Sequence, residues 1–146
     1  MKIFGILAIS ACTLPLGCIA IAQTATPGIA INLTGGAVVP GPADTDGSGT
    51  ARITFAEGAQ NVCYELSVRN IAPATMAHIH GGTLTEVGGP PLVVLGTPTD
   101  GRSSGCASAP QRLVDAIRAN PAGFFVTIHN AEFPGGAVRG QLAPQE

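Results

Sequence analysis

Three histidines are the residues of this chain best suited to chemistry, and all of them fall in two short apolar segments. His78 and His80 lie within residues 77–82, and His129 ends the run 124–129. If both segments are β-strands, residues two apart point to the same face, so His78 and His80 share one side. Three imidazoles suit a copper or zinc ion and leave one coordination position open. The sequence does not place His129 beside the other two, and the alternative is that the rings hydrogen-bond to backbone groups.

Arg139 is the other candidate site residue. One interpretation is an anion-facing side chain near the histidines, and the other is a strand anchor that pairs with an acidic group such as Glu65 or Glu132. No catalytic residues are predicted, because a Gly-x-Ser-x-Gly motif is absent and the acidic residues are scattered over turns and exposed strand faces. The sequence therefore favours a protein that is not an enzyme.

The composition predicts many short strands joined by tight turns. Of 146 residues, 45% are hydrophobic, but only 4% are aromatic and 11% are charged, with 20 glycines and 12 prolines. A helical bundle would need more leucine, glutamate and lysine than this. We expect one mostly β domain, because the length is too short for two domains of ordinary size.

The first 22 residues are typical of a signal peptide. Lys2 supplies the positive charge, residues 3–22 are uncharged, and residues 20–22 fit the small-x-small rule for cleavage before Gln23. We therefore expect a signal peptide over 1–22 and a mature β domain over 23–146, secreted or periplasmic, with no membrane span after cleavage. Two alternatives are an uncleaved anchor and a lipoprotein tethered through Cys18 or Cys12.

Cleavage changes both the charge and the cysteine count. The mature chain keeps six arginines and no lysine against nine acidic residues, a formal charge of −3, and it has no basic stripe. Nucleic acid is therefore not an expected partner, and the partner outside the cytoplasm is unknown. Only Cys63 and Cys106 remain, and an even pair in an exported domain most simply forms one disulfide.

Alternating apolar residues locate the expected strands. The clearest alternation covers residues 62–69, and 110–120 is the only segment with a helical pattern. Residues 96–108 are expected to be a long loop, and 92–95 a short strand that is buried on both sides or lies at an end of the domain. About seven to eight strands and one short helix predict an all-β Greek-key sandwich or barrel. The other expected strands cover 29–33, 50–56, 77–82, 124–129 and 137–142.

The chain resembles the CHRD (chordin-type) domain over essentially the whole mature sequence. This resemblance implies an extracellular β domain but no settled activity. The matching blocks are residues 33–36, 39–40, 49–51, 66–68, 77–81 and 89–93, the strand that ends in His129, and the block 133–142, which reads Phe-Pro-Gly-Gly-Ala-Val-Arg-Gly-Gln-Leu.

The chain also resembles, more weakly, the β-barrel of copper/zinc superoxide dismutases. Both have a His-x-His strand, then a later strand that ends in His, and then a last strand that opens with Gly-Gly before an Arg. This resemblance implies copper ligands at His78, His80 and His129, and an anion-guiding role for Arg139. The sequence departs from that family, because no histidine remains to bridge two metals and residues 81–105 lack zinc ligands. We expect a non-catalytic extracytoplasmic module that binds a partner or has a structural role. The alternative is a mononuclear copper or zinc protein with a three-histidine site, and dismutase-like activity belongs to this alternative.

Overall fold

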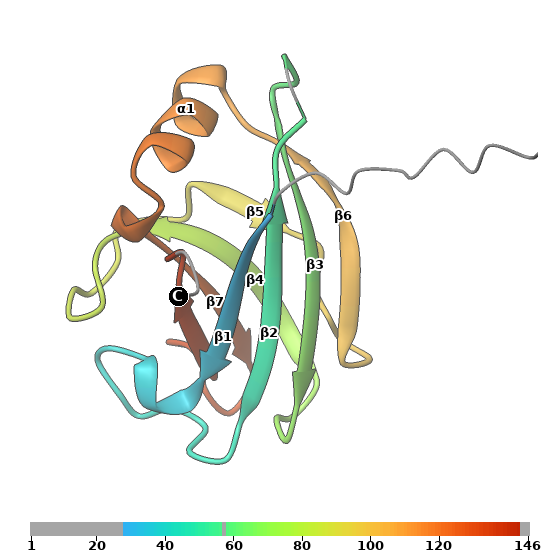
Figure 1. Ribbon diagram of the computed structural model, residues 1–146. Helices are drawn as coiled ribbons and strands as arrows, with labels where there is room; N and C mark the ends of the chain where they lie inside the picture. Colours follow the sequence, from blue (N-terminus) through green and yellow to red (C-terminus); the bar gives the residue numbers. More distant parts are fainter. Residues whose placement is uncertain (1–27, 57, 144–146) are drawn as a thin grey trace, which may run out of the picture.

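The computed structural model describes residues 28–56 and 58–143, which fold into one antiparallel sheet of eight strands in the order β5-β4-β7-β8-β1-β2-β3-β6. This all-β fold agrees with the sequence prediction (Figure 1). The strands are β1 (Ile29–Thr34), β2 (Ser48–Thr54), β3 (Asn61–Arg69), β4 (Ala74–Gly81), β5 (Val93–Leu95), β6 (Arg102–Ser108), β7 (Phe124–Asn130) and β8 (Val138–Gln141).

The sheet curls into a nearly closed barrel in which the two outermost strands, β5 and β6, approach each other. Gly96, directly after β5, joins them: its N–H donates to the hydroxyl of Tyr64 on β3 at 2.8 Å, and its carbonyl accepts from the hydroxyl of Ser103 on β6. The predicted disulfide is confirmed, because Cys63 and Cys106 face each other across β3 and β6 and are covalently joined. Both links hold β6 against the barrel.

The hydrophobic core fills the inside of the barrel. Strand alternation sends Ile79 of β4 and Ile128 of β7 inward, and both side chains are fully buried. Helix α1 (Gln111–Ala119) lies at one end of the barrel (Figure 1). It buries Val114 and Ile117, three residues apart on one stripe, as the helical pattern of 110–120 predicts. Two single-turn 3-10 helices, η1 (Gly35–Ala37) and η2 (Pro121–Gly123), complete the described elements.

Two local predictions need correction. The prediction of a loop over 96–108 is wrong for Arg102–Ser108, which pairs along its length with β3. Its small polar residues remain largely exposed at the sheet edge, so no apolar alternation marks the strand. For the strand predicted over 92–95, burial on both sides is wrong, because Val94 of β5 is 68% exposed. β5 is an edge strand, and only the side chains of Val93 and Leu95 enter the core.

The predicted signal peptide, residues 1–22, lies outside the described residues, together with its cysteines Cys12 and Cys18. Within residues 28–56 and 58–143, no helix is long and apolar enough to cross a bilayer.

Candidate metal centre

The two histidine-bearing strands are neighbours in the sheet. β4 and β7 run antiparallel, with His78 opposite Thr127 and His80 opposite Phe125, while His129 lies one pair further along, opposite Met76. Because Ile79 and Ile128 point into the barrel, the residues next to them in sequence point outward. All three histidines therefore stand on the outer face of the same strand pair.

On that face the three imidazoles converge. The ring centroids lie 5.6 Å apart for His78 and His80, 5.2 Å for His78 and His129, and 6.3 Å for His80 and His129. One nitrogen of each ring lies within 4.8 Å of one nitrogen of each of the others. The structure thus brings together the three residues that the sequence singled out, although His129 is 49 positions beyond His80.

Backbone carbonyls fix the orientation of two of the rings. Nδ1 of His80 lies 2.8 Å from the carbonyl oxygen of Gly89, and Nδ1 of His129 lies 3.0 Å from that of Pro134. A carbonyl oxygen can only accept, so each Nδ1 carries the hydrogen and each neutral ring keeps its lone pair on Nε2. Nε2 of His129 and Nδ1 of His78 are buried and meet no hydrogen-bond partner among the described residues.

Burial and mutual proximity favour the neutral form of two imidazoles. Burial lowers the pKa of His78, and the positive charges that His129 and His80 would carry lower it further. The pKa of His129 is also lowered, first by burial and then by His80, against an opposing effect of the hydrogen bond to Pro134. Neutral imidazoles are the form that ligates metal ions.

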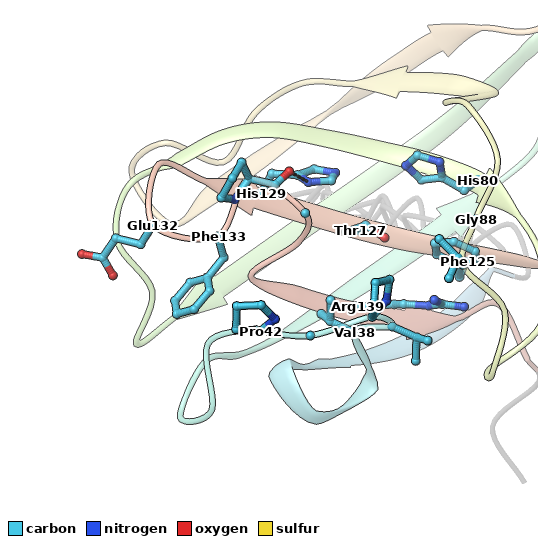
Figure 2. A pocket seen from close by; sticks show the side chains of 16 residues that line it. Val38, Pro42, His80, Gly88, Phe125, Thr127, His129, Glu132, Phe133 and Arg139 are labelled. Carbon is cyan, nitrogen blue, oxygen red and sulfur yellow. Dashed lines mark hydrogen bonds between the residues drawn. The ribbon is translucent and has the colours of Figure 1, made fainter.

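Phe125 and Arg139 support the cluster from the neighbouring part of the sheet. The ring of Phe125 stacks on His80 with centroids 5.3 Å apart and planes 13° apart. The guanidinium carbon of Arg139 lies 3.5 Å from the centroid of the same ring, so Phe125 sits between a histidine and an arginine (Figure 2). Arg139 is 2% exposed, and its terminal nitrogens donate to the backbone carbonyls of Glu86, at 2.9 Å, and Thr83, at 2.5 Å. The arginine thereby ties the loop after β4 to β8.

Loops on this outer face line a cavity of about 410 Å³ that is partly open to solvent and lies beside the imidazoles. Its walls come from three loop segments, 38–42, 87–88 and 132–135, and from side chains of β4, β7 and β8. His80 and His129 line it, and Figure 2 shows them on the opposite side of the cavity from the 38–42 segment. His78 and His129 are buried although they lie outside the barrel, and His80 is partly buried.

The residues that orient the cluster were not identified from the sequence. Gly89 and Pro134 act through their backbone carbonyls, which carry no side-chain signal, although both lie in Gly-Pro segments. Phe125 precedes Val126 in an apolar run, and no pattern in that run distinguishes a ring that stacks on His80 from a core residue. Only the proximity of Phe125 and His80 across β4 and β7 reveals its role.

A comparison with protein families matches the CHRD domain over residues 29–142, nearly the whole described chain. The chain belongs to the CHRD domain family. CHRD domains are extracellular or secreted domains. All three histidines, the two disulfide-bonded cysteines and Arg139 lie inside the match. No curated protein and no solved structure gives a significant match.

Proposed function

We propose that this CHRD-domain protein is an exported, non-catalytic module that binds one copper ion through His78, His80 and His129. The observation that carries the proposal is the convergence of three ring nitrogens within 4.8 Å of one another. Nitrogens bound at about 2.0 Å to one tetrahedral ion lie about 3.3 Å apart. We expect rotations of the rings to close that difference when an ion binds.

The free nitrogens identify the ligand atoms. The carbonyls of Gly89 and Pro134 hold the Nδ1 hydrogens of His80 and His129, which leaves Nε2 of both rings for the ion. For His78 we assign Nδ1, which is buried and meets no hydrogen-bond partner among the described residues. Burying such a nitrogen without a partner is costly, and a bound ion would offset that cost.

Copper fits this donor set better than zinc does. Affinity for nitrogen ligands rises along the first-row metals to Cu²⁺ and falls at Zn²⁺. The described cluster contains three histidines and no carboxylate or thiol, so its ligands are neutral and intermediate in softness.

Isothermal titration of the metal-free protein with Cu²⁺, and separately with Zn²⁺, tests the proposal. We expect one Cu²⁺ per chain, bound more tightly than Zn²⁺, and a stabilisation of about 2.7 kcal/mol at a hundred times the dissociation constant. His129→Gln should abolish tight binding, and Thr127→Val, a change on the same face, should not. Failure of both metals to bind or stabilise would leave only an exported module with another role.

Turnover and export are tested separately. The copper-loaded protein should not accelerate superoxide decay beyond an equal amount of a simple copper complex, and an acceleration lost in His129→Ala would support a dismutase instead. Export is supported by the signal sequence over residues 1–22. N-terminal sequencing of the protein from the periplasm or the medium should begin at Gln23, whereas a start at Cys18 would indicate a lipoprotein.

A further inference from the structure

We infer that the open coordination position of the proposed copper site faces the cavity beside the imidazoles and accepts an aromatic ligand with an anionic oxygen, a phenolate. This inference rests on the proposed function and names the class of molecule that the bound ion would hold. It follows from where the cavity lies, from what lines it and from the charge around it.

The cavity begins at the imidazoles. His80 and His129, two of the three proposed ligands, form part of its wall, so an ion held by them would lie next to this space. Its volume of about 410 Å³ lies within the range of small-molecule sites. Three protein ligands leave a position for an outside ligand, as in catalytic zinc centres. A molecule in the cavity can therefore reach the ion without displacing a histidine.

The walls facing the histidines suit an apolar ring. Val38 and Pro42 lie across the cavity from the imidazoles, and Phe133 lies beside them (Figure 2). Valine, proline and phenylalanine side chains offer apolar and aromatic surface but no side-chain hydrogen-bond donor or acceptor. A flat ring gains contact area there, and a sugar or a peptide backbone would lose its hydrogen bonds to water.

The charge around the cavity favours an anionic donor atom. Three neutral imidazoles leave the two positive charges of Cu²⁺ uncompensated, and Arg139 adds a further positive charge to the lining. Nε of Arg139 is buried and meets no acceptor among the described residues, although both terminal nitrogens are bonded. Glu132 is the one acidic residue of the lining. The balance is positive, so a phenolate should bind better than a neutral aromatic amine.

One glycine of the cavity lining can be replaced by a larger residue without a clash at its Cβ. Gly135 lines the cavity, and a Cβ built there meets no atom within 4 Å, so Gly135→Leu places a side chain in open space. Gly36 lies outside the lining and has equally open surroundings, so Gly36→Leu is the matched control. Phe133→Ala, which removes the ring contact, provides a second variant if Gly135→Leu does not fold.

The test compares three probes on the copper-loaded protein, followed by visible absorption and copper electron paramagnetic resonance. We expect 4-nitrophenolate to bind at the copper, and 4-nitroaniline, which has the same shape without the charge, to bind at least about tenfold more weakly. Azide, which is small, should bind independently of the cavity. Gly135→Leu and Phe133→Ala should each weaken 4-nitrophenolate about tenfold and azide less than about twofold, and Gly36→Leu should change neither.

Two outcomes would overturn the inference while leaving the copper site intact. The first is azide binding at the copper without 4-nitrophenolate binding, and the second is 4-nitrophenolate binding that neither Gly135→Leu nor Phe133→Ala weakens relative to azide. Failure to load copper at all would instead refute the proposed function, and the inference with it.

Discussion

Replacing His78 by leucine should have opposite effects on stability without and with copper. Without metal, His78 buries Nδ1 with no partner among the described residues, so removing the ring would break no hydrogen bond of that nitrogen. The side chain is only 9% exposed, so leucine, which fills a similar volume, would keep most of the apolar contact. A histidine kept for structure should behave differently, because its removal would break bonds that hold the fold.

The expected magnitude follows from the buried nitrogen. An unsatisfied buried polar group destabilises the fold by about 1 to 3 kcal/mol, so removing it should stabilise the variant. Imperfect packing of leucine should offset up to about 1.5 kcal/mol of that stabilisation. The metal-free variant should therefore be as stable as the wild type or more stable by about 1 kcal/mol, a rise in Tm of about 4 °C for a domain of this size. With Cu²⁺ at a hundred times the wild-type dissociation constant, the wild type gains about 2.7 kcal/mol and the variant should gain almost nothing.

Urea and thermal unfolding of both proteins, with chelator and with Cu²⁺, measure the two effects. Thr127→Val is the matched control, because Thr127 lies directly opposite His78 and is 4% exposed but offers no imidazole. It should leave the copper-dependent gain intact. A His78→Leu variant that loses more than about 1 kcal/mol without metal would refute the reasoning and favour a structural role for the ring.

Three further predictions concern the surroundings of the site. Gly88→Ala should lower the free energy of unfolding in urea by about 1 to 3 kcal/mol and weaken Cu²⁺ binding, because its Cβ would approach the ring of Phe125 to 2.3 Å. Gly89→Ala, whose Cβ meets nothing within 4 Å, should change neither the stability nor the Cu²⁺ affinity. Burial holds the pKa of His78 below its usual 6.5, so the unfolded chain takes up this proton first as the pH falls. The metal-free wild type should therefore lose stability from about pH 7 to pH 5, and His78→Leu should lose less over the same range. Replacing Cys63 and Cys106 together by serine should lower the free energy of unfolding by about 2 to 4 kcal/mol. Calorimetric titration should give an unchanged Cu²⁺ affinity, because the disulfide joins β3 and β6, which carry none of the proposed ligands.

The sequence predicted those parts of the fold in which a repeating pattern reports burial. β3 alternates because only one of its faces enters the core, and α1 repeats Val114 and Ile117 on the stripe that it buries. β6 could not be predicted, because its exposed small polar residues follow no such pattern. Its position depends on pairing with β3 and on the Cys106 disulfide.

The candidate site was predictable in composition but not in geometry. Alternation placed His78 and His80 on one face, yet nothing local to the sequence states that β7 is the neighbour of β4, which brings His129 to them. The cavity depends on loops that fold back over this face, and loop paths are set by long-range contacts such as those of Arg139 with the backbone of residues 83–86. These are tertiary contacts, which the spacing of apolar residues and the strand propensities of single residues do not encode.

The location of the ion in a crystal of copper-loaded protein tests the central claim most directly. An anomalous difference map at the copper absorption edge should show one peak, at about 2.0 to 2.1 Å from Nδ1 of His78 and from Nε2 of His80 and His129. Copper found only at another position, or the absence of any peak in protein exposed to stoichiometric Cu²⁺, would contradict a three-histidine copper site.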